Sequence, residues 1–108
     1  MEFDEFHIDI RKLRDYCLNS NHPVGKHKAR VFASQLGIHR REAEILKEKI
    51  LREINDAELV PTFEDQFGKR FSADLGVNIN NRFALVRTIW ILKSGRNIPE
   101  LVTCYIII

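Results

Sequence analysis

Apolar residues recur every three or four positions through the first half of the chain, which predicts helices. Asp9 is placed to cap the first helix. Pro23 disfavours helical backbone at His22, so this helix ends before residue 22. Its apolar positions are Ile10, Leu13 and Cys17, with Tyr16 beside them.

Two further helices follow the same period. The second begins after Gly25 and ends at Gly37, which suits the left-handed position after a helix C-terminus. The third spans about residues 40–55. Residues 1–8 have no clear period and are expected to form a short strand or an arm that packs on the body. The apolar positions of the two helices are Ala29, Phe32, Ala33 and Leu36, then Ala43, Leu46, Ile50 and Ile54.

In the second half of the chain, apolar residues recur at every second position, which indicates strands. Residues 70–75 alternate, and residues 76–81 lead into a hairpin. Residues 83–92 are apolar on both faces, so we expect a central strand that is covered on both sides. Pro99 opens the last strand, residues 101–107. The pattern predicts an α+β fold in which three N-terminal helices pack on one face of a C-terminal antiparallel sheet of three to four strands.

The totals fit one soluble domain over residues 1–108, because 108 residues leave no room for a second core. The start of the chain is acidic and lacks the apolar stretch of a signal peptide, and no apolar run is long enough to cross a bilayer. Cys17 and Cys104 are expected to be buried free thiols, with a disulfide or a reactive thiol as the alternative. We therefore expect the protein in the cytoplasm.

The net charge of +2 does not by itself require nucleic acid, but cations cluster in the first half. Residues 22–29, with the sequence HPVGKHKA, place imidazoles and ammonium groups where a loop enters a helix. Free N–H groups at a helix start attract anions, and Lys26 and Lys28 add positive charge, so phosphate is the expected ligand. The alternative is that His22 caps the preceding helix and the two lysines are merely solvated.

A second group of polar residues lies in the predicted sheet. Thr103 and Tyr105 alternate on the last strand and therefore share a face. Beside Arg87 or Thr88 of a neighbouring strand, they would form a cradle for a phosphodiester. The alternative is that Thr and Tyr occur here only because they favour strands. No metal or nucleotide motif is present, and His22 and His27 lack further ligands nearby, so no cofactor and no metal is expected.

The sequence resembles a family of uncharacterised small bacterial domains. The matching residues are Lys12, Leu13, Tyr16, Leu18 and Asn19; His22, Pro23, Gly25, Lys28, Ala29 and Phe32; Asn81 and Arg82; Val86, Thr88 and Trp90; and Pro99, Leu101, Val102, Thr103 and Tyr105. Ile106 departs from this pattern, because a proline is expected after the terminal tyrosine. His22 is the one histidine at a family position.

The layout of that family, helices followed by a four-stranded antiparallel sheet, is similar to that of the barnase–EndoU–colicin–RelE superfamily of metal-independent ribonucleases, many of them toxins. The resemblance implies that His22 is the general base on the ribose 2′-hydroxyl and that Lys28 and Arg87 stabilise the pentavalent phosphate. It implies that Thr103 or Tyr105 orients the phosphate. We expect further substrate contacts from Lys26, Arg82, Thr88 and Trp90.

Two other functions compete with a toxin-like endoribonuclease. One is a non-catalytic module that binds a second copy of itself or a cognate protein from a neighbouring gene, through an exposed apolar patch at residues 106–108. The other is RNA binding without cleavage. The nuclease hypothesis requires His22 and Lys28 to share one cleft with Thr103 and Arg87.

Overall fold

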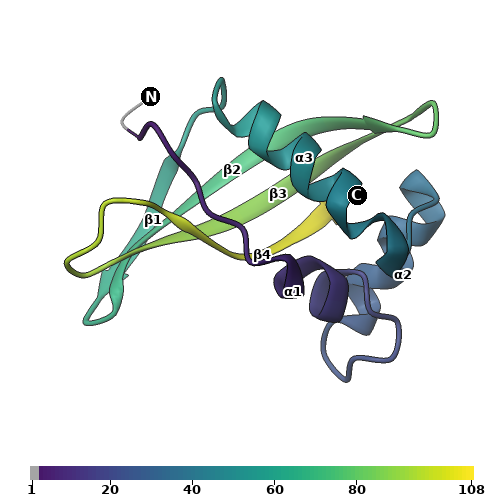
Figure 1. Cartoon of the computed structure of the whole chain (residues 1–108), viewed down its shortest axis with the longest axis horizontal. Helices are drawn as coiled ribbons and strands as arrows, with labels where there is room; N and C mark the ends of the chain where they lie inside the picture. Colours follow the sequence, from purple (N-terminus) through teal and green to yellow (C-terminus); the bar gives the residue numbers. More distant parts are fainter. Residues whose placement is uncertain (1–2) are drawn as a thin grey trace.

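The computed structural model describes residues 3–108. Helices come first and an antiparallel sheet follows, as the α+β prediction requires (Figure 1). The elements are α1 (Ile10–Lys12), the π-helical turn η1 (Leu13–Cys17), α2 (Lys26–Leu36), the 3-10 turn η2 (Arg40–Glu42), α3 (Ala43–Ile54), β1 (Val60–Asp65), β2 (Gly68–Ile79), β3 (Arg82–Lys93) and β4 (Glu100–Ile107).

The predicted helix ends are confirmed. The Asp9 carboxylate accepts a hydrogen bond from the backbone N–H of Arg11 at 3.0 Å, and Gly37 ends α2 with a φ of 68°. The third predicted helix begins with η2 before it becomes α3. Among residues 3–108, every helix is too short or too polar to cross a membrane.

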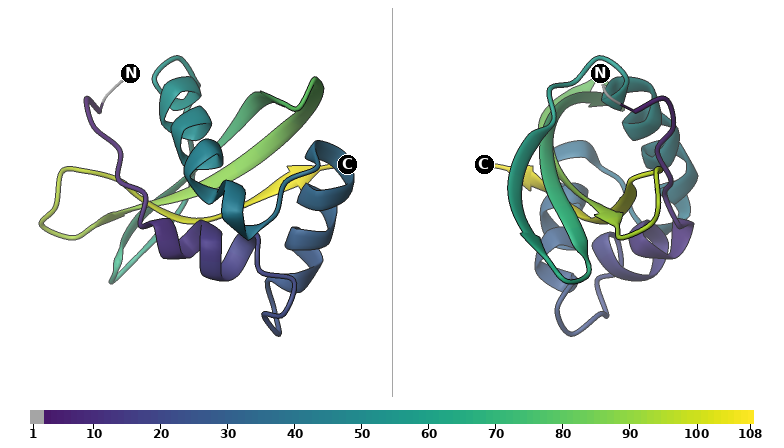
Figure 2. Two further views of the ribbon diagram at one scale, coloured as in Figure 1. Left: turned by 45° about the vertical axis from the view of Figure 1, so that its right-hand side comes forward. Right: turned by 90° about the vertical axis from the view of Figure 1, so that its left-hand side faces the viewer.

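The four strands are joined as a simple meander in the order β1–β2–β3–β4, so β1 and β4 form the edges. The long β2 and β3 pair from Gly68 opposite Lys93 to Ile79 opposite Arg82. Asn80 and Asn81 connect them with positive φ values of 56° and 59°, which suit a tight hairpin. Figure 2 shows how strongly this sheet twists and curves.

One strand was missed, and one expectation about the strands was wrong. β1 was not predicted, because all six of its residues are exposed and therefore carry no alternating pattern. β3 is not covered on both sides: Phe83 and Leu85 are 63% and 39% exposed, whereas their neighbours Ala84 and Val86 are buried.

The core joins alternate residues of β2 and β3 to the apolar faces of the helices. The segment before α1 is an arm that contacts the sheet: the Phe6 ring lies edge-on to Trp90, with centroids 5.2 Å apart, and His7 makes one parallel bridge to Glu100. Residues 1 and 2 of the predicted arm lie outside the described residues. The largest fully buried side chains are those of Trp90, Phe32, Ile8, Leu13, Leu36, Ile38, Leu46, Ile50, Ile54, Leu75, Val77 and Val86.

Candidate functional site

The turn that leads into α2 is built around His22. Its Nδ1 accepts hydrogen bonds from the backbone N–H groups of Val24, at 3.0 Å, and Gly25, at 2.9 Å. A Cβ at Gly25 would lie 2.2 Å from the carbonyl oxygen of Tyr16, so this turn requires glycine. The imidazole therefore fixes the direction in which α2 begins.

Tyr16 connects this turn to Lys28. The tyrosine ring lies edge-on to the His22 ring, with centroids 4.9 Å apart. Its hydroxyl accepts a hydrogen bond of 2.8 Å from Lys28 Nζ. Lys28 is half-buried, and this bond holds its ammonium group in one place, which is the condition for a preorganised positive charge.

Lys28 lines an open hollow of about 350 Å³ between α2 and the edge strand β4. The residues around the hollow are His27, Lys28 and Val31 of α2 with Tyr105 and Ile106 of β4. The structure therefore brings Lys28 from the helical half beside Tyr105 from the sheet. His27 was not predicted as a site residue, although its spacing of four from Val31 places both on one side of α2.

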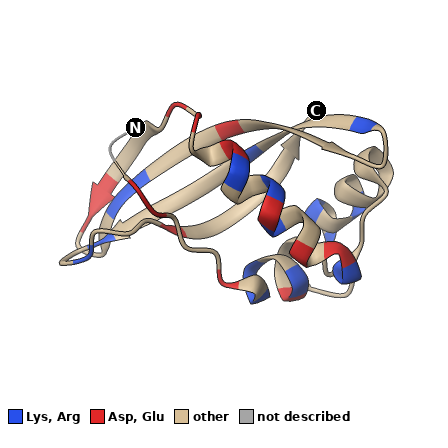
Figure 3. Cartoon of the chain, turned by 45° about the horizontal axis from the view of Figure 1, so that its top comes forward, with Lys and Arg blue, Asp and Glu red and all other residues tan. Residues whose placement is uncertain are grey.

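The charges on α2 are of one sign. Its 11 residues include Lys26, Lys28 and Arg30 and no Asp or Glu. Figure 3 shows that acidic and basic residues instead mix along α3. The surface of α2 is thus suited to anions, without the acidic neighbours that offset the cations of α3.

Arg87 lies beside Tyr105 in the sheet. By strand register, Arg87 is directly opposite Asp74 on β2 and Tyr105 on β4, so the three side chains form one row. Arg87 Nε and Nη2 donate to the two carboxylate oxygens of Asp74 at 2.8 and 3.0 Å. These bonds lower the pKa of Asp74 and raise that of Arg87, so both groups stay charged. Tyr105 also raises the pKa of Arg87, because its hydroxyl lies beside the guanidinium.

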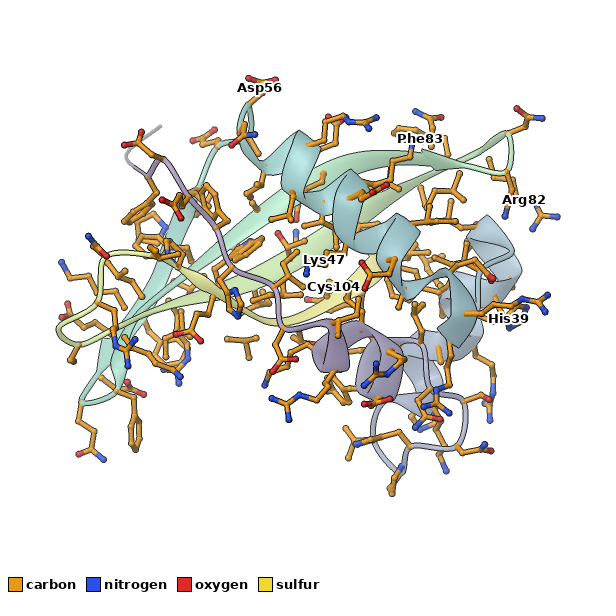
Figure 4. The ribbon with its side chains drawn as sticks, viewed as in Figure 1. His39, Lys47, Asp56, Arg82, Phe83 and Cys104 are labelled. Carbon is orange, nitrogen blue, oxygen red and sulfur yellow. The ribbon has the colours of Figure 1, made fainter. Side chains whose placement is uncertain are left out.

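Thr103 lies two positions from Tyr105 on β4, opposite Ile89 of β3. Its Oγ1 is 3.6 Å from Cys17 Sγ, which ties η1 to β4. Cys17 and Cys104 are both buried and free, as predicted, and Figure 4 shows Cys104 inside the molecule. A hydrogen bond from the Cys104 thiol lowers the pKa of Cys17 to about 7, whereas the pKa of Cys104 is raised by that bond and by burial.

Other predicted residues do not meet at the hollow. Thr88 and Trp90 are fully buried: Trp90 Nε1 donates to Thr88 Oγ1 at 2.8 Å, and Thr88 donates to the carbonyl oxygen of Ala73 at 2.8 Å. These two side chains connect neighbouring strands within the core. Arg82 lies near the other end of α2, where its Nη1 donates to the carbonyl oxygen of Ser34 at 3.4 Å.

Ligands for a metal ion are not grouped in the part of the chain that the structure describes. Among residues 3–108, no three His, Cys, Asp or Glu side chains lie together in a way that would hold one.

The chain belongs to the family described as "Domain of unknown function (DUF6883)", whose model matches residues 1–108. This agrees with the predicted membership of a family of uncharacterised small domains. No curated protein and no solved structure matches the chain. The similarity to the ribonuclease superfamily remains a prediction from the sequence.

Proposed function

We propose that this domain cleaves RNA without a metal ion, by attack of a ribose 2′-hydroxyl on the adjacent phosphate, at the hollow between α2 and β4. The observation that carries the proposal is that Lys28 and Tyr105 line one hollow, with Arg87 directly opposite Tyr105. Two cations and a phenol around an open surface match the needs of a phosphodiester whose negative charge increases during the reaction.

In this reaction His27 takes the proton of the 2′-hydroxyl. The O2′–P bond forms and the P–O5′ bond breaks, which yields a 2′,3′-cyclic phosphate and a free 5′-hydroxyl. Lys28 and Arg87 stabilise the five-coordinate phosphate, and the Tyr105 hydroxyl gives its proton to the departing 5′ oxygen and regains one from solvent. General acid or base groups and preorganised charges each typically contribute about 10²–10⁴-fold in rate.

His22 and Thr103 have positioning roles in this proposal. Nδ1 of His22 is occupied by two backbone donors, so His27, an exposed residue of the hollow, is the better base. Thr103 acts through its contact with Cys17. We take the helices to pack on one face of the sheet, so that the opposite face stays open to substrate. Two free cysteines fit the reducing cytoplasm, where RNA is available.

The test is incubation of the purified protein with single-stranded RNA in EDTA. Wild type is expected to cleave, and His27→Ala and Lys28→Met are expected to be at least about 100-fold slower. Lys47→Met on α3 removes the same charge away from the hollow and is expected to cleave at the wild-type rate. Intact RNA with wild type, or equal rates for Lys28→Met and Lys47→Met, would overturn the proposal.

A second candidate function is binding of another copy of the chain through the edge strand β1. Val60, Phe63 and Phe67 on the β1–β2 hairpin are 49%, 57% and 61% exposed, and the outer edge of β1 has no partner among the described residues. The predicted patch at residues 106–108 is smaller, because Ile106 is buried and Ile107 half-buried. Sedimentation equilibrium is expected to show a dimer that Phe63→Ser dissociates; a wild-type monomer at all concentrations would refute this candidate.

A further inference from the structure

An apolar strip lies beside Arg87 and Tyr105 on the same face of the sheet. Leu85 is two positions from Arg87 on β3 and therefore points to the same side, and Ile107 of β4 lies directly opposite Leu85. Phe83 extends the strip towards the β2–β3 hairpin, where Figure 4 labels it. Phe83 is 63% exposed and Leu85 39% exposed, although both are large apolar side chains.

The Phe83 ring is supported by a glycine on the neighbouring strand. A Cβ at Gly76 would lie 2.9 Å from Cε1 and 3.1 Å from Cζ of Phe83, so the ring rests against the bare backbone of β2. An aromatic ring that is held in this way and still largely exposed presents a flat surface to solvent. Because its position is already restricted, little side-chain freedom is lost when a flat ligand binds.

Arg87 supplies a positive charge on the same face as the strip, two positions beyond Leu85 on β3. Arg82 precedes Phe83 and therefore points to the opposite face, where it donates to the carbonyl oxygen of Ser34. The acidic group of this region, Asp74, is engaged by both of its carboxylate oxygens with Arg87. A ligand that combines flat apolar rings with negative charges would therefore meet complementary groups along the strip.

We infer that Phe83 stacks a base of the single-stranded RNA whose scissile phosphate lies at Arg87 and Tyr105. This inference rests on the proposed function for the identity of the ligand. Stacking on an aromatic side chain accepts any base, and arginine adds attraction to the phosphates. A second copy of the chain fits the strip less well, because a stable dimer typically uses roughly 20–30 residues a side and the strip offers Phe83, Leu85 and Ile107.

The test measures binding without cleavage. The probe is a fluorescent single-stranded 2′-O-methyl RNA oligonucleotide, which lacks the attacking hydroxyl, and the readout is fluorescence anisotropy at low salt. Phe83→Ala is expected to bind about 5- to 150-fold more weakly than wild type, the loss expected for one stacked base. Ile45→Ala is the control, because Ile45 is a large apolar side chain that is 45% exposed on α3; its affinity is expected to be unchanged.

Two further variants separate the stacking of a base on Phe83 from the packing of Phe83 against Gly76. Phe83→Leu keeps an apolar cover on the glycine but lacks an aromatic face, and is expected to bind as weakly as Phe83→Ala. Phe83→Trp is expected to bind at least as tightly as wild type. All variants are compared at temperatures where circular dichroism shows the native fold.

Each result decides the inference. Equal affinity of wild type and Phe83→Leu would overturn it, as would a wild type that does not bind the probe or a Phe83→Ala defect that appears only as loss of dimerisation. A Phe83-dependent affinity in a protein that leaves unmodified RNA intact would support the stacking site and refute the cleavage proposal. Cleavage that does not depend on Phe83 would support the cleavage proposal and refute the stacking site.

Discussion

Replacing His22 distinguishes a turn-forming histidine from a catalytic one. In the structure its Nδ1 accepts hydrogen bonds from the N–H groups of Val24 and Gly25. His22→Ala removes this acceptor. His22→Asn keeps one, because Oδ1 of asparagine occupies the same position along the side chain as Nδ1 of histidine, yet asparagine does not act as a base at neutral pH.

The expected loss of stability follows from the exposure of the two donors. Val24 is 60% exposed, so water can replace the lost bond to its N–H group at little cost. Gly25 is buried, and an unsatisfied buried N–H costs about 1–3 kcal/mol. Loss of a comparable side-chain cap costs about 0.5–2 kcal/mol. We therefore expect His22→Ala to lower the free energy of unfolding by about 1–2 kcal/mol, or Tm by about 5–10 °C.

Urea unfolding at pH 7.5 and initial rates of RNA cleavage are measured for wild type and both variants. His22→Asn is expected to lose less than about 0.5 kcal/mol and to cleave within about threefold of wild type, since the turn is kept. A His22→Asn protein that is as stable as wild type but more than 100-fold slower would refute this reasoning and restore His22 as the general base.

Three other changes test separate parts of the account. Gly25→Ala is expected to lose about 1–3 kcal/mol in urea unfolding, because its Cβ would lie 2.2 Å from the Tyr16 carbonyl oxygen; an unchanged midpoint would contradict the close approach. Tyr105→Phe is expected to slow RNA cleavage by about 100-fold with an unchanged Tm; an unchanged rate would remove Tyr105 from the reaction. Hydrogen bonds from Arg14 lower the pKa of Asp15 to about 2. The stability that this carboxylate contributes is therefore fully present above the pKa of the unfolded state, about 3.9, and is lost as the pH falls towards 2. Urea midpoints at pH 5 and pH 2.5 are thus expected to differ less in Asp15→Asn than in wild type, and equal differences would contradict the lowered pKa.

Local sequence signals were sufficient for most of the fold. Asp9 and Gly37 marked helix ends because capping depends on the chemistry of single residues. Alternation predicted β2 because one of its faces is buried, whereas β3 was predicted from a run that is apolar on both faces. β1 left no such signal, since both of its faces are exposed and its assignment as a strand depends on hydrogen bonds to β2.

The site was less predictable than the fold. Lys28 and Tyr105 were identified separately from their chemistry, but their meeting at one hollow depends on how α2 lies against β4. The same packing of α2 against β4 brings His27 to the hollow. Conversely, Trp90 matched the pattern of a binding residue, yet its burial and its bond to Thr88 are tertiary properties.

The chemistry of the cleaved ends tests the central claim most directly. A short single-stranded RNA is incubated with the wild-type protein in EDTA, and the products are identified by mass spectrometry. If Lys28, Tyr105 and Arg87 support attack by the 2′-hydroxyl, the products carry a 2′,3′-cyclic phosphate and a 5′-hydroxyl, and an RNA with a single 2′-deoxy nucleotide at the cleaved position stays intact. RNA that remains uncut, or products with 5′-phosphate ends, would contradict the account.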